Sequence, residues 1–143
     1  MPPFRPRPLT VAERATQDFL LEQPRGQGAG LCAQIDHARV IGECHCVCAT
    51  IDLAVDPAAP RWNRRPADGR IAASAVSRPD APQHPGELLL HVIDGRLAEL
   101  EIADWRGDNE LAEFPPVRTW EPPRAGGPWP AGPEPESQLG DDD

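Results

Sequence analysis

The sequence predicts a single α+β domain, in which two N-terminal helical segments pack on one face of a mainly antiparallel sheet of four or five strands. Three observations lead to this prediction: a capped helical segment that begins near residue 10, short runs in which apolar and polar residues alternate, and a hairpin signal at Asp94-Gly95. Alternation of this kind is typical of strands with one buried face. The early helices are the elements that can cover that face.

Proline and glycine set the limits of the domain. The chain of 143 residues holds nineteen prolines and twelve glycines, most of the excess at the two ends and in one central loop. That distribution leaves roughly 95 to 100 residues able to bury a core. We therefore predict a disordered arm at residues 1–9, one domain at residues 10–106, and a disordered, proline-rich acidic tail at residues 107–143. Within that tail, Phe114 and Trp120 are the residues that could dock on the domain.

The first helix is predicted from its cap. Thr10 is a favourable N-cap residue, and Glu13 three positions later completes a capping box. The side chains expected on the buried face of this helix are Val11, Ala15, Phe19 and Leu20. Apolar spacing also predicts a second helical segment, whose expected buried residues are Leu31, Gln34, Ile35 and Ala38.

The late part of the domain carries the clearest hairpin. Asp94-Gly95 suits a two-residue type I′ turn, in which both central residues need positive φ. The side chains expected to face the core are Leu88, Leu90 and Val92 on one arm and Ala98, Leu100 and Ile102 on the other. A short strand of small residues, 71–77, is expected before it.

The run from residue 39 to residue 56 holds three of the four cysteines. Ile51, Leu53 and Val55 alternate with polar or small residues, and the three cysteines have the same period. If the backbone stays extended, their sulfurs line one face and pack as small apolar groups, which is the interpretation that we favour. A bend would instead let them converge on one point.

Cysteine and histidine are also the ligands that zinc prefers, so this run is a candidate metal site. The candidate ligands are Cys44, His45, Cys46 and Cys48. Single-residue spacing disfavours the site, because an extended chain would hold the outer two sulfurs about 13 Å apart. A pair of reactive thiols is the third and weakest alternative, since it needs a lowered thiol pKa.

A second candidate site lies on the hairpin, where Glu99 and Glu101 alternate with apolar residues and Asp104 follows, with His91 on the opposing arm. Paired carboxylates can perform acid–base chemistry when one is buried. The alternation favours a solvated strand face instead, and such a negative face would recognise a basic protein partner.

Charge and motifs exclude several classes. Residues 1–75 hold nine arginines and eight acids, whereas residues 76–143 hold five arginines and fifteen acids, for a net charge of −9. A chain this acidic disfavours nucleic acid as a ligand. The N-terminus lacks the apolar stretch of a signal peptide and no run is long enough to span a membrane, so we expect a cytoplasmic protein. The motifs of serine hydrolases, zinc proteases and phosphate-binding loops are absent from the sequence.

Two segments together resemble a group of small bacterial proteins of unknown function: ARVIGECHCVCATIDLAVD and GELLLHVIDGRLAELEIADW. That group carries a capped N-terminal helix, a strand segment of the form Val-x-Gly-x-Cys-x-Cys-Gly-Cys-Pro-Ser/Thr, and a late Asp-Gly hairpin. The resemblance covers about residues 9–105 and implies the same α+β fold. This chain has Val47 and Ala49 where the group tends to have glycine and proline.

The function that these observations favour is a non-catalytic interaction or accessory module, such as an immunity-type protein, whose acidic sheet face binds a basic partner. A zinc-binding domain built on the cysteine run is the first alternative, and no other cofactor is expected. A cysteine-based thiol enzyme is the second.

Overall fold

The computed structural model describes residues 4–22, 29–44, 48–62, 70–80, 85–106 and 112–126. The elements in chain order are α1 (Val11–Leu20), α2 (Ala29–Ile35), β1 (Ala38–Glu43), β2 (Ile51–Val55), β3 (Ile71–Val76), β4 (Gly86–Ile93), β5 (Arg96–Asp104), the 3-10 helix η2 (Val117–Thr119) and β6 (Arg124–Ala125).

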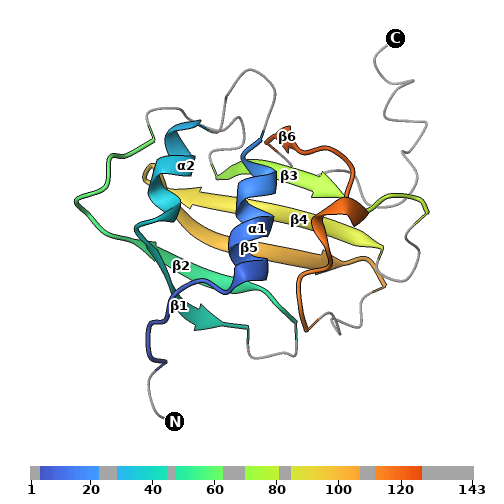
Figure 1. Ribbon diagram of the computed structural model, residues 1–143, viewed down its shortest axis with the longest axis horizontal. Helices are drawn as coiled ribbons and strands as arrows, with labels where there is room; N and C mark the ends of the chain where they lie inside the picture. The colour runs from blue at the N-terminus through green and yellow to red at the C-terminus, as the bar shows by residue number, and fades with distance from the viewer. Residues whose placement is uncertain are drawn as a thin grey trace.

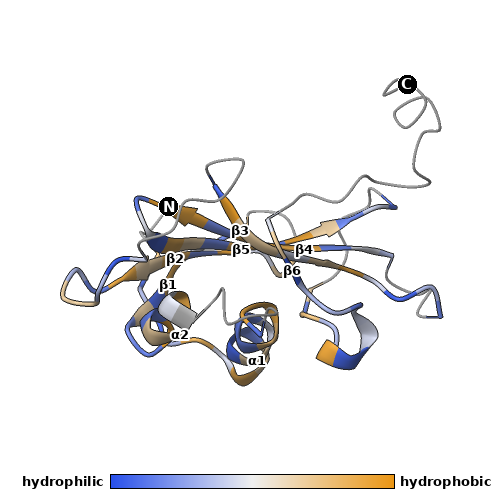
Figure 2. Ribbon diagram, turned by 90° about the horizontal axis from the view of Figure 1, so that it is seen from above, coloured by the Kyte–Doolittle hydropathy of each residue, from blue (hydrophilic) through white to orange (hydrophobic). Residues whose placement is uncertain are grey.

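The strands form one sheet in the order β1-β2-β5-β4-β3-β6, and each neighbouring pair is antiparallel. Both helices lie on the same side of it, as the edge-on view in Figure 2 shows, and α1 crosses the middle of the sheet in Figure 1. The predicted α+β class and antiparallel sheet are confirmed. The described sheet has six strands and not four or five, because β6 comes from a segment that we expected to be tail.

The late hairpin is confirmed in its turn and corrected in one arm. Asp94 and Gly95 have φ values of 55° and 74°, as a type I′ turn requires. The register shifts between His91 and Val92, so that Val92 pairs with Leu97. Because this bulge reverses the side-chain alternation, Leu97 enters the core in place of Ala98.

The capping box of α1 is confirmed, and Leu20 is buried as predicted, but the rest of the buried face differs from the prediction. Val11 is 88% exposed. The side chains that face the sheet are Glu13, Thr16, Gln17 and Leu20. Arg7 holds Glu13 towards the sheet, and a residue two positions away lies about 200° around the helix axis, so Val11 must face outwards. The apolar spacing did not predict this buried face, because one of its members is the Glu13 carboxylate, which is held there by an ion pair with Arg7.

Helix α2 buries Leu31, Gln34 and Ile35 as predicted, whereas Ala38, which we expected in this helix, is buried as the first residue of β1. Gln34 joins the helix to the hairpin. Its side-chain Nε2 donates to the carbonyl oxygens of Pro60 at 3.0 Å and Gly95 at 2.8 Å, while its Oε1 accepts from the backbone N–H of Leu97 at 3.0 Å. One fully buried amide therefore fixes the helix, the loop after β2 and the β4–β5 turn relative to one another.

Residues 112–126 belong to the folded unit, so the predicted domain boundary at residue 106 is too early. Trp120 is completely buried and Phe114 is 7% exposed, both within the core cluster. The backbone N–H of Glu121 donates to the Val76 carbonyl at 2.7 Å, and β6 then pairs with β3. The docking of Phe114 and Trp120 is the one that the sequence analysis considered, whereas strand β6 was not predicted because the proline-rich segment has no apolar period. The rest of the predicted tail, residues 127–143, lies outside the described residues.

In the part of the chain that the structure describes, no helix has both the length and the apolar character needed to cross a membrane.

Candidate functional site

The sheet face opposite α1 and α2, here called the outer face, carries two of the three predicted carboxylates, Glu99 and Glu101. Cross-strand pairing places Asp52, Glu99, His91 and Ile71 in one row across β2, β5, β4 and β3. The next row holds Glu101 on β5 beside Leu89 on β4. Register alone thus brings two of the predicted binding residues, Glu99 and Glu101, next to a histidine.

Four side chains of this face form a connected group, which we call the outer-face cluster: Arg70, His91, Glu99 and Glu101. The His91 Nε2 atom lies 2.8 Å from Glu101 Oε1 and 3.9 Å from Glu99 Oε1. Arg70 Nε donates to His91 Nδ1 at 3.0 Å, and a terminal Arg70 nitrogen lies 3.6 Å from Glu99 Oε1. Ligand atoms of the histidine and the two glutamates all lie within 4.8 Å of one another.

The contacts of the outer-face cluster define the tautomer of His91. A guanidinium can only donate, so Nδ1 must accept from Arg70 and the ring proton must be on Nε2, where it faces Glu101. The hydrogen bond from His91 lowers the pKa of the Glu101 carboxyl below its ordinary value, against the opposing effect of burial. Glu101 is therefore an anion at neutral pH.

Asp104, the third predicted binding residue, does not join this group. Its position in β5 shares the alternation of Leu100 and Ile102, which face the helices, and its side chain is buried. It accepts hydrogen bonds from the backbone N–H of Arg106 at 2.9 Å and from that residue's Nε at 3.4 Å. These local contacts give Asp104 a structural role at the end of the strand.

The cysteine run is not an extended strand, which corrects the interpretation that we favoured. Strand β1 ends at Glu43, strand β2 begins at Ile51, and the two pair antiparallel, so the chain reverses between them. The backbone N–H of Cys44 donates to the Thr50 carbonyl at 3.1 Å and closes the connection. The period-two cysteine pattern resembled a strand, yet Cys44 and Cys48 both lie outside the paired strands.

The cysteines that are described are accessible. Cys44 is exposed and disulfide-bonded, Cys48 is a half-buried thiol, and Cys32 is an exposed thiol. His45, Cys46 and Val47 lie outside the described residues, so the proposed four-ligand metal site stays a prediction. Burial, together with the charges of Asp18 and Glu22, raises the pKa of the Cys32 thiol, which makes that residue a poor nucleophile.

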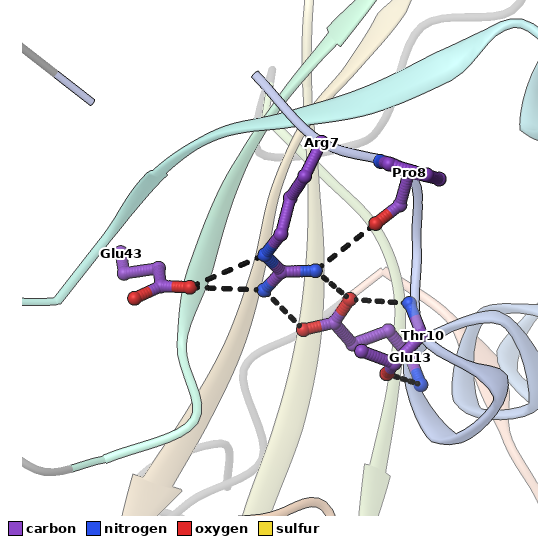
Figure 3. Close-up of polar contacts among 5 residues, drawn as sticks. All are labelled: Arg7, Pro8, Thr10, Glu13 and Glu43. Atoms are coloured by element: carbon purple, nitrogen blue, oxygen red, sulfur yellow. Dashed lines mark hydrogen bonds and ion pairs between the residues drawn. The ribbon is translucent and has the colours of Figure 1, made fainter. Parts of the chain in front are cut away.

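Cys44 and Cys48 line one cavity of about 560 Å³ at the end of the β1–β2 hairpin. Arg7 is part of its wall and holds two carboxylates at once, as Figure 3 shows. Its guanidinium binds Glu13 of α1 at 3.0 and 2.9 Å and Glu43 of β1 at 3.0 Å. The N-terminal arm thereby joins the first helix to the first strand beside the cysteine hairpin.

Glu13 makes the fold sensitive to acid. Burial on its own would raise the pKa of the Glu13 carboxyl, but hydrogen bonds from Arg7 and the Thr10 backbone outweigh that effect and lower it below 4.5. A carboxyl whose pKa is lowered by folding stabilises the protein above its unfolded pKa, and this contribution is lost as the pH falls through the folded pKa.

We therefore expect Glu13→Gln to reduce the free energy of unfolding at pH 7 by about 1 to 2 kcal/mol, the usual contribution of hydrogen bonds to a charged group. The deficit should shrink as the pH falls through the lowered pKa of the native Glu13 carboxyl, because that carboxyl is then protonated as well. Urea unfolding of both proteins from pH 7 to pH 3 measures it, and a deficit that does not change with pH would contradict the assignment.

No protein-family model, no curated protein and no solved structure matches this chain. The resemblance to the group of small bacterial proteins consequently remains a prediction.

Proposed function

We propose that this protein is a non-catalytic interaction module whose outer sheet face binds a basic protein partner through Asp52, Glu99 and Glu101. The observation that carries the proposal is the register of β2 and β5, which sets these three carboxylates in neighbouring positions on a face that neither described helix covers. Each carboxylate lies at least partly in contact with solvent.

Arg70 shows how a partner's cationic group would bind. Its side chain is 51% exposed and its contact with Glu99 is long, at 3.6 Å. An ion pair of this length contributes little, so an incoming arginine or lysine can replace Arg70 at Glu99, although complete displacement of Arg70 also costs its 3.0 Å hydrogen bond to His91. The outer-face cluster then supplies specificity through charge and position, without any chemical step.

The test compares two double variants that change the net charge equally. We expect Glu99→Gln/Glu101→Gln to lose the basic proteins that the wild-type chain retains from its own cell extract at low salt. The control, Asp18→Asn/Glu22→Gln, removes two exposed carboxylates at the first helix and should retain them. The retention experiments with the wild-type chain and both variants are all carried out in EDTA. If nothing basic is retained, or if both variants behave alike, the outer face is not the binding surface.

A zinc-binding function is the second candidate, and the β1–β2 hairpin favours it. The objection from sequence was that an extended chain separates the sulfurs, whereas the reversal after Cys44 removes that objection and places Cys48 on the wall of the same cavity. Thiolates, unlike a disulfide, bind zinc, so the site would require reduction of Cys44. Elemental analysis of reduced, chelator-free protein decides: less than about 0.2 zinc per chain ends this proposal.

The remaining proposals follow from sequence. We place the module in the cytoplasm of a bacterium and expect no nucleic-acid ligand, given the chain's net charge of −9. A thiol enzyme built on the cysteine run is the least supported candidate, because Cys44 is disulfide-bonded and a disulfide offers no thiolate.

A further inference from the structure

We propose that His91, Glu99 and Glu101 form a binding site for a divalent metal ion of the manganese-to-zinc series, and that Arg70 competes with the metal for these groups. This inference goes beyond partner recognition, because the ion would bind the isolated protein. One imidazole and two carboxylates are a mixed donor set that such ions accept, with further positions left for water.

The distances fit an ion with a small adjustment. Metal–ligand bonds of about 2.0 to 2.2 Å place neighbouring donor atoms roughly 2.8 to 3.5 Å apart. His91 Nε2 and Glu101 Oε1 already lie 2.8 Å apart, and Glu99 Oε1 is 3.9 Å from the same nitrogen. A movement of the Glu99 carboxylate by about an ångström completes a three-ligand set.

Burial of the imidazole distinguishes this group from a patch of surface acids. The His91 side chain is only 10% exposed, and its Nε2 points at the carboxylates from the middle of the sheet. Leu89 and Ile71, its neighbours on the same face, are 5% and 8% exposed. Two carboxylates, one guanidinium and an uncharged ring leave a net charge of −1 in this partly buried setting, where a divalent ion is attracted more strongly than in water.

The hydrogen bond from Arg70 holds His91 in the tautomer with its proton on Nε2, and this tautomer cannot bind a metal ion through Nε2. A metal at Nε2 requires the ring proton to be on Nδ1, so one proton leaves Nε2 and one arrives at Nδ1 through solvent while the ring stays neutral. An N–H at Nδ1 would face the Nε–H of Arg70, now 3.0 Å away, and the two donors repel. Arg70 must therefore move aside, which its half-exposed side chain permits.

Because Arg70 competes with the metal ion, the proposal predicts tighter metal binding in one variant and weaker binding in two others. Calorimetric titration of the full chain with MnCl₂ should show binding that Arg70→Gln tightens by about tenfold, because a positive charge near the ion is removed. His91→Gln and Glu101→Gln should each weaken it by at least about tenfold. Glu22→Gln is the matched control: it removes an exposed carboxylate just after the first helix, away from the outer face, and should change the affinity less than about twofold. Manganese is the probe since thiolates prefer zinc.

A second readout locates the ion independently of the variants. Bound Mn²⁺ should broaden the methyl resonances of Leu89 and Ile71 before those of Leu31, which lies on the helical side of the sheet. Binding that is unchanged in His91→Gln and Glu101→Gln, or that is not tightened in Arg70→Gln, overturns the proposal. Broadening that does not affect the methyl resonances of Leu89 also overturns the proposal. Because no partner protein is present, these outcomes are separate from the retention experiment, which is run in EDTA.

Discussion

Replacing Trp120 with alanine is expected to lower the free energy of unfolding by about 4 kcal/mol, the largest single effect that we predict. The indole is completely buried in the core cluster. Its segment is also held through the backbone, since Arg78 N–H donates to the Thr119 carbonyl at 2.9 Å and Glu121 N–H donates to the Val76 carbonyl at 2.7 Å. Removing the side chain leaves a cavity and loosens the contacts that add β6 to the sheet.

Urea unfolding monitored by circular dichroism measures this loss, because the signal does not require Trp120 as a probe. Val117→Ala is the matched control: it truncates a half-exposed side chain in the same segment and should cost less than about 1 kcal/mol. If Trp120→Ala costs no more than this control, then residues 112–126 do not belong to the cooperative folding unit.

The second large effect concerns two buried glutamines that should respond in opposite directions to the same substitution. Gln34→Met is expected to destabilise the protein by about 3 kcal/mol, since it leaves the N–H of Leu97 without its acceptor and takes a donor from two carbonyls. Gln17 is equally buried, yet among the described residues its side-chain nitrogen and oxygen both lack a hydrogen-bond partner.

Gln17→Met should therefore be neutral or stabilising by about 1 kcal/mol, because methionine has a similar shape and nothing to desolvate. Each variant serves as the control for the other, as both lose one amide in the same core. Denaturant unfolding of both variants at a single pH measures the two changes in the free energy of unfolding. Equal losses would show that Gln17 is also hydrogen-bonded in solution, and a small loss for Gln34→Met would show that its three contacts contribute little to stability.

The elements that depend on residues close together in the sequence were predicted correctly. The capping box at Thr10 and the Asp94-Gly95 turn each depend on residues adjacent in sequence, and both are confirmed. The same holds for the alternation of Ile51, Leu53 and Val55.

What the sequence could not reveal depends on contacts between different elements, even where these are close along the chain. Arg7 binds Glu13 of α1 and Glu43 of β1, and β1 pairs with β2. Neither leaves a periodic trace in the sequence. The outer-face cluster is an intermediate case: the alternation placed Glu99 and Glu101 on one face, and the hairpin register put His91 opposite Glu99 and diagonal to Glu101. Arg70 was missed because it comes from a separate strand connection and only the fold brings it there.

The arm at the start of the chain has a protective consequence. Arg7 exchanges two backbone hydrogen bonds with Val40, at 3.0 and 2.8 Å, on the side of β1 that has no neighbouring strand within the described sheet. Unsatisfied strand margins invite other chains to add to them, which is a common route to aggregation. Removal of this bridge would leave the backbone N–H and C=O groups of Val40 open to an incoming strand, so Arg7 protects the margin of the sheet at that position.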